Sequence, residues 1–99
     1  MRSTIYQLSI RVGQTRYNCS IGVVPTEAGD GELEQLVSIQ SEGGGRLLQA
    51  RVPRGFFVSN WTVGDLVRQA QRKGWRPAGK GSAFKLDWDY VSSAPEKVR

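Results

Sequence analysis

Residues 61–77, WTVGDLVRQAQRKGWRP, carry the strongest local signal in the chain. The apolar residues recur at the spacing of a helix that buries one face, at Val63, Leu66, Val67 and Ala70. Thr62 is predicted to cap this helix, with Asp65 at the reciprocal capping position. The helix should therefore run from Val63 to about Lys73, where Gly74 supplies a left-handed stop.

Aromatic residues lie at both ends of this predicted helix. Trp61, before the predicted cap, and Leu66 have the spacing of a hydrophobic staple. Truncating either side chain to alanine should then destabilise the fold by about 1–4 kcal/mol. At the other end, Trp75 follows the stop, and Pro77 prevents the helix from continuing.

The rest of the chain is organised as strands. Alternation of apolar and polar residues, typical of a half-buried strand, occurs at residues 5–12, 17–23, 37–39, 48–52 and 84–90. Short glycine-bearing connections at 13–15 and 43–45 indicate two hairpins. The order is ββββαβ, which predicts an α+β fold: an antiparallel sheet of four or five strands with the amphipathic helix packed across one face. Residues 56–58 are either a short strand or a packed loop.

Length and composition allow one core. The chain has 99 residues, so we expect a single domain over residues 1–91 and a frayed tail over residues 92–99, which has no apolar periodicity. No apolar run approaches the roughly 20 residues that cross a bilayer. A lone cysteine, Cys19, cannot form an internal disulfide, and no secretory leader is recognisable, so we expect a cytoplasmic protein.

The residues needed for common catalytic mechanisms are scarce. The chain has no histidine, which removes the usual general base and the commonest metal ligand. Cys19 alternates with apolar residues and is predicted to be buried rather than nucleophilic. An enzyme would have to use carboxylates, with Asp65, Asp87 and Asp89 as the remote candidates. We therefore expect a non-enzymatic protein with no cofactor and no metal.

Positive charge is concentrated in the second half of the chain. The net charge is +5, and residues 51–99 hold ten basic residues against four acidic ones. Five of the basic residues lie on the predicted helix and on its C-terminal flank: Arg68, Arg72, Lys73, Arg76 and Lys80. With aromatic residues nearby, this set supports nucleic-acid binding through the basic helix 63–73 as the second functional hypothesis.

Two consecutive aromatic residues support the leading hypothesis. Phe56 and Phe57 follow Pro53 and Gly55, and one of the two rings must face outward if the backbone is extended. An outward ring is a candidate anchor for another protein. The sequence thus favours a small protein-binding module, and it is compatible with a homo-oligomer.

Residues 61–87 also resemble the C-terminal end of many short uncharacterised bacterial proteins. The shared pattern is a capped helix, then G-W-x-P, a link of small residues, and F-x-L-D in a strand, here Gly74–Pro77 and Phe84–Asp87. The resemblance covers about a quarter of the chain. It implies a bacterial origin and supports the fold, and it carries over no site residue.

Overall fold

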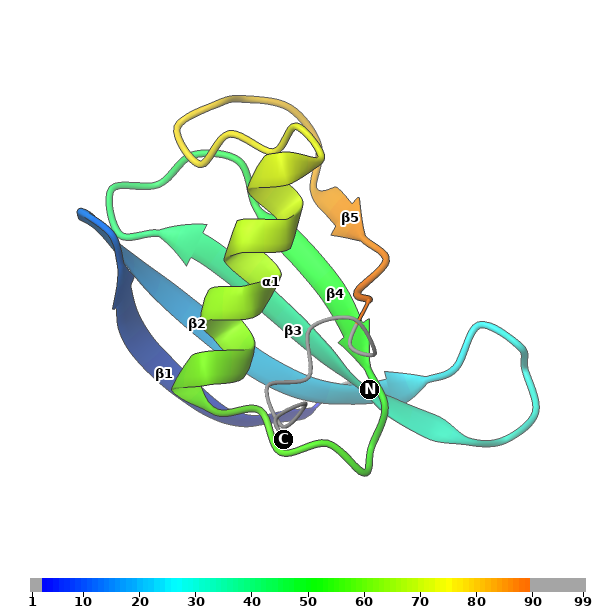
Figure 1. The fold of residues 1–99 in the computed structure, drawn as a ribbon. Coiled ribbons are helices and arrows are strands. Elements are labelled where there is room, and N and C mark those ends of the chain that lie inside the picture. The colour runs from blue at the N-terminus through cyan, green and yellow to red at the C-terminus, as the bar shows by residue number, and fades with distance from the viewer. Residues whose placement is uncertain (1–2, 90–99) are drawn as a thin grey trace, which may run out of the picture.

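Two β-hairpins form the first part of the sheet (Figure 1). In the computed structural model, which describes residues 3–89 and the side chains of residues 7–89, strand β1 (Ser3–Val12) pairs antiparallel with β2 (Thr15–Pro25). Strand β3 (Leu33–Ser41) pairs with β2 and with β4 (Leu48–Val52), again antiparallel. Both predicted hairpins are confirmed. The acidic β2–β3 loop extends away from the body of the molecule (Figure 1).

The last strand differs from the prediction. Helix α1 (Asn60–Arg72) crosses the sheet, and β5 (Phe84–Leu86) then pairs parallel with β4, giving the order β1-β2-β3-β4-β5. The α+β class and the element order are confirmed, but the sheet is mixed, because a helical crossover returns the chain in the direction of β4. The strand predicted over residues 84–90 ends at Leu86. Its last residue and the predicted tail lie outside the described residues.

One face of the sheet and one face of α1 share the core. Cys19 lies opposite Ile39 in the β2–β3 register, and the predicted inward residues of β2, β3 and β4 that are buried with them are Tyr17, Ile21, Val37, Leu48, Ala50 and Val52. The helix contributes the predicted apolar stripe, fully buried: Val63, Leu66, Val67 and Ala70. The other face of the sheet carries polar residues, so α1 covers one side only (Figure 1).

The start of α1 corrects the predicted cap. The helix begins at Asn60, and Ser59 is the cap: its hydroxyl accepts the Thr62 backbone N–H at 3.4 Å. Thr62 is the reciprocal partner, and its hydroxyl accepts the Ser59 N–H at 3.3 Å. Both Ser and Thr are good capping residues, and the helix uses the earlier of the two. Asp65 is therefore not a capping residue.

The predicted staple is wrong for the same reason. With Ser59 as the cap, the residues with staple spacing are Val58 and Val63, which are both buried. Trp61 instead lies in the first turn, 42% exposed.

The predicted helix stop is confirmed. Gly74 adopts φ +108°, which an L side chain rarely tolerates. The Trp75 N–H donates to the Ala70 carbonyl at 2.9 Å, and the Gly74 N–H donates to Gln71 at 3.1 Å, which together form a Schellman motif. Within the described part of the chain, no helix has the length and apolar character needed to cross a bilayer.

Candidate functional site

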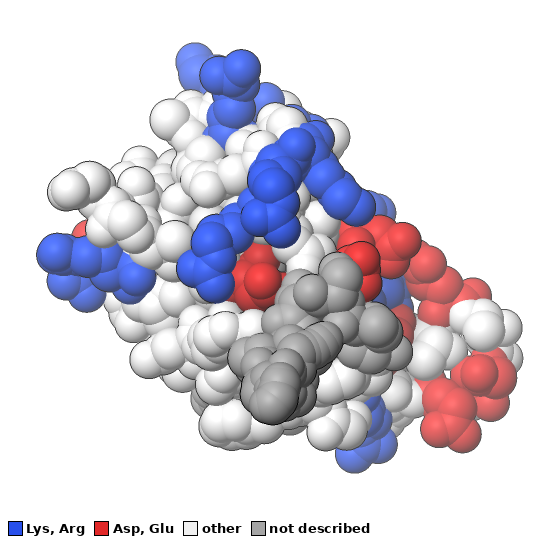
Figure 2. All heavy atoms as spheres, viewed as in Figure 1, with Lys and Arg blue, Asp and Glu red and all other residues white. Residues whose placement is uncertain are grey.

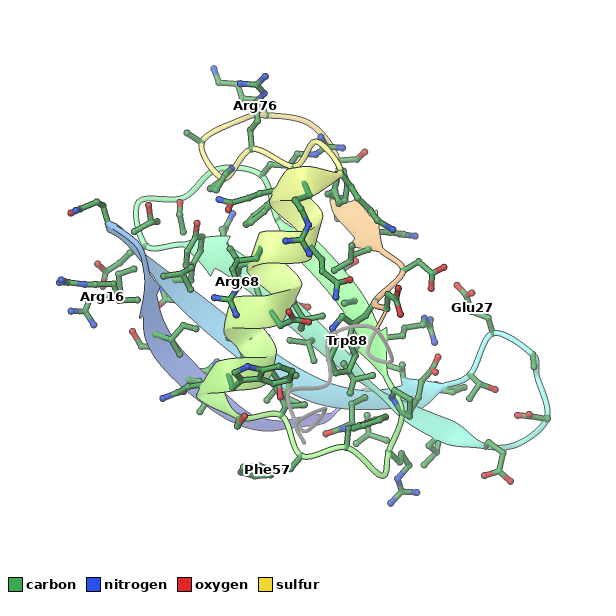
Figure 3. All side chains as sticks on the ribbon, in the orientation of Figure 1. Arg16, Glu27, Phe57, Arg68, Arg76 and Trp88 are labelled. Carbon is green, nitrogen blue, oxygen red and sulfur yellow. The ribbon has the colours of Figure 1, made fainter. Side chains whose placement is uncertain are left out.

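The two consecutive phenylalanines have different environments. Phe56 is held in the 53–59 loop: its carbonyl accepts the Gln35 side-chain amide at 2.8 Å, and its ring meets Trp88 edge-on at 5.7 Å. Phe57 is 79% exposed. Figure 3 shows its ring pointing away from the body, below the start of α1. Of the two predicted anchor residues, Phe57 is thus the more exposed, since Phe56 is 38% exposed.

A second exposed aromatic residue follows Phe57 in the chain, in the first turn of α1. The Phe57 carbonyl accepts the Thr62 hydroxyl at 3.2 Å, which ties Phe57 to the first turn of α1. Trp61 is in that same turn, 42% exposed. We call Phe57 and Trp61 together the aromatic end. The sequence did not identify Trp61 as a surface residue, because its spacing matched a buried staple.

The five basic residues predicted for nucleic-acid binding are all exposed, at two different places. Arg68 and Arg72 lie on α1, and Lys73 is its C-terminal cap. Arg76 and Lys80 lie in the loop beyond the helix end, and Figure 3 shows Arg76 well separated from Arg68. Figure 2 shows Lys and Arg over the helix and this loop, with acidic groups gathered toward the β2–β3 loop.

Of the aromatic residues near those basic residues in the sequence, Trp75 is buried, and Phe56, Phe57 and Trp61 are exposed to different extents. Trp75 is 2% exposed, and its indole N–H donates to the Arg46 carbonyl at 3.2 Å. Phe56 packs against Trp88 but is still 38% exposed. Phe57 and Trp61 are 79% and 42% exposed, at the opposite end of α1 from Arg76.

A groove of about 450 Å³ lies between the edge strand β1 and α1, and we call it the β1–α1 groove. Its basic lining residues are Arg11, Arg16 and Arg68, and Trp61 lies along it. The described residues that line it include no acidic side chain. The sequence did not reveal this site, because its arginines come from two strands and a helix that only the fold brings together.

Gly64 shapes the floor of the groove. A Cβ built at this position would lie 3.3 Å from the Arg68 Nη1 atom, so the Arg68 guanidinium lies directly over the glycine. Arg68 therefore turns back toward the first turns of α1, where Trp61 is. Figure 3 shows Arg68 on the side of the helix that faces β1 and Arg16.

The carboxylates considered for catalysis are not gathered at one pocket. Asp65 is 8% exposed and accepts the Trp88 indole N–H at 2.8 Å and the Gln69 amide at 3.0 Å. Gln69 also exchanges two hydrogen bonds with the Asp89 backbone, so this network fastens the chain after β5 to α1. Asp87 lies instead in a separate groove with Arg51 and Lys85, on the uncovered side of the sheet. Among residues 3–89, no three potential metal ligands cluster.

Cys19 is predicted to be inert as a nucleophile. It is 2% exposed, and burial raises the pKa of its thiol to about 12. At about pH 8.5, the ordinary pKa of a free cysteine, iodoacetamide should modify unfolded protein readily and native protein barely at all. Because the folded state retains the proton, the thiol contributes stability below about pH 8.5 that is lost as the pH rises. Equal modification rates with and without denaturant would contradict the buried position.

Comparisons of the chain with protein-family models, with curated proteins and with solved structures gave no significant match.

Proposed function

We propose that this protein is a small, non-enzymatic cytoplasmic module that binds another protein through the aromatic end formed by Phe57 and Trp61. The observation that carries this proposal is the 79% exposure of Phe57, twice the 38% of Phe56, whose ring packs against Trp88. A large apolar ring held in water is unfavourable for an isolated protein and favourable once a partner covers it. Aromatic residues of this kind often dominate the energy of protein interfaces.

The local structure prepares Phe57 for binding. On one side Phe56 is fixed by Gln35 and Trp88, and on the other side Val58 is 1% exposed. The Thr62 hydroxyl holds the Phe57 carbonyl itself. Because the backbone is held on both sides, binding would cost little conformational entropy beyond the rotamers of the ring.

Nucleic-acid binding is the second candidate, supported by the exposure of the five basic residues on α1 and in the loop that follows it. It ranks second for two reasons. Arg72 and Lys73 lie at the negative end of the helix dipole, which stabilises cations there without any ligand. The buried Trp75 also cannot stack with a base near Arg76 and Lys80.

Cross-linking tests the leading proposal. A photoreactive phenylalanine analogue at position 57 should capture a discrete partner in cells, to be identified by mass spectrometry. In competition for that identified partner, Phe57→Ala should bind about tenfold more weakly or worse, as expected for loss of an anchor residue. Leu33→Ala is the matched control, because Leu33 is an exposed apolar residue, 41% accessible, in β3 next to the β2–β3 loop.

Both substitutions remove exposed side chains, so both variants should melt close to wild type. Partner affinity that is the same for wild type and Phe57→Ala would refute the aromatic end as the binding surface. Phe56→Ala is a poor probe of binding, because it also removes the contact with Trp88.

A further inference from the structure

We propose that the partner contributes an extended acidic segment that adds as a strand to the outer edge of β1 inside the β1–α1 groove. This inference rests on the proposed protein-binding function and specifies the chemistry of the partner. The groove begins at Trp61, so it is continuous with the aromatic end.

The edge of the sheet provides the first argument. β1 is the first strand in the sheet order, and within residues 3–89 its strand neighbour is β2. Residues 9–13 of β1 and its turn line the groove. An edge strand presents a row of backbone N–H and C=O groups that another extended chain can pair with.

The opposite wall of the groove is formed by the first turns of α1, which contribute Trp61, Gly64 and Arg68. The Arg68 guanidinium lies over Gly64, 3.3 Å from a Cβ built there, so this wall presents a positive charge to an incoming chain. The volume of about 450 Å³ is within the range of established ligand sites, roughly 300–1,000 Å³.

The side chains along the groove define the pattern of the incoming segment. Ile10 alternates inward, and Val12 packs against the core, while Arg11 and its register partner Arg16 point to the other face. Residues of an added strand would alternate in the same way. Its inward positions would meet Val12 and Trp61, which favours apolar residues there. Its outward positions would lie beside Arg11, with Arg16 one strand further away, which favours acidic residues.

The arginines are available for such a partner. Arg16 has a 4.0 Å contact with Glu42, and both side chains are largely exposed, so this pair holds Arg16 weakly. Arg68 lies at the α1 wall of the groove and provides a further positive charge. Three positive charges with no acidic lining residue select an acidic ligand over a neutral or basic one.

The same charges could attract a nucleic acid, but the strand edge favours a peptide. A peptide backbone alternates donors and acceptors and so matches both kinds of group on β1. A phosphate backbone offers acceptors and would leave the β1 carbonyl groups without partners. An extended acidic peptide is therefore the ligand that fits the whole groove.

A binding assay with the full chain tests this inference. The probe is a short fluorescent peptide that alternates glutamate and valine, followed by fluorescence anisotropy. We expect binding to wild type, and binding at least about tenfold weaker to Arg16→Glu and to Arg68→Glu, because each reversal replaces attraction with repulsion. Lys85→Glu is the control: it makes the same charge change at an exposed site outside the groove and should stay within about twofold of wild type.

Three further ligands separate strand addition from charge alone. The same peptide with alternate backbone nitrogens methylated keeps its charge but loses its donors, and it should not bind. A peptide that alternates lysine and valine should not bind either. Oligothymidylate should bind more weakly than the acidic peptide. With the acidic peptide bound, amide hydrogen exchange should slow in residues 9–12, where the added strand pairs.

The outcomes that overturn the inference are distinct. Absence of peptide binding, equal binding of the methylated peptide, or tighter binding of oligothymidylate would each refute strand addition by an acidic segment. The protein-binding function is judged separately by Phe57→Ala. If the peptide fails while Phe57→Ala still loses its cross-linked partner, the strand-addition inference alone is wrong.

Discussion

Gly45→Ala is expected to lower the free energy of unfolding by about 2–4 kcal/mol, because both the backbone and the space at this position require glycine. Gly45 adopts φ +117°, and a Cβ built there would lie 2.1 Å from the Pro77 carbonyl oxygen. That oxygen also accepts the Arg46 N–H at 3.2 Å, so the backbone cannot retreat without losing a hydrogen bond. Chemical denaturation would measure the change.

Gly43→Ala is the matched control in the same turn. Gly43 has no positive φ, and nothing lies within 4 Å of a Cβ built there. Its substitution should change stability by no more than about 0.5 kcal/mol. Similar stability of the two variants would show that the β3–β4 turn does not pack against the Pro77 loop as described.

Trp75→Ala is expected to have the largest effect of any single truncation, a loss of about 3–5 kcal/mol. Trp75 is 2% exposed, and its ring lies 6.0 Å from that of Tyr17, so it joins the helix end to β2. Its indole also hydrogen-bonds the Arg46 carbonyl, which would be left unpaired. The same denaturation experiment measures this variant.

Trp61→Ala is the matched comparison for Trp75→Ala, because it truncates an exposed tryptophan instead of a buried one. Because Trp61 is 42% exposed and is not part of the staple, its truncation should cost about 1–2 kcal/mol, clearly less than that of Trp75. Leu66→Ala, fully buried, should remain in the range of about 2–5 kcal/mol. A greater loss for Trp61→Ala than for Trp75→Ala would restore the staple and contradict the observed helix start.

The arrangement of secondary structure could be predicted because its signals are local. Alternation with a period of two identified both hairpins, and the helical spacing of the stripe at Val63 and Leu66 identified the buried face of α1. Gly74 predicted the end of the helix, because the left-handed backbone that ends a helix favours glycine, a preference that depends on residue type and not on distant contacts. The residue at which the helix begins could not be predicted as well, because Ser59 and Thr62 are both suitable capping residues.

The sites were predicted less well, because exposure depends on contacts between distant segments. The sequence limited the outward ring to Phe56 or Phe57, and only the tertiary structure shows that the Phe56 ring packs against Trp88 while Phe57 is 79% exposed. Asp65 had the position of a capping residue, and the distant Trp88 made it a buried hydrogen-bond acceptor. The bacterial origin implied by the resemblance stays a prediction.

By itself, the sequence determined the α+β class, the two hairpins and the helix, since hydrophobic periodicity and glycine stops act within a few neighbouring residues. Tertiary structure alone decided that β5 runs parallel to β4, because strand direction follows from how the crossover through α1 returns to the sheet. It also created the β1–α1 groove, where Arg16 and Arg68 come together from positions far apart in the chain. Such a site depends on the placement of whole elements, which no local pattern encodes.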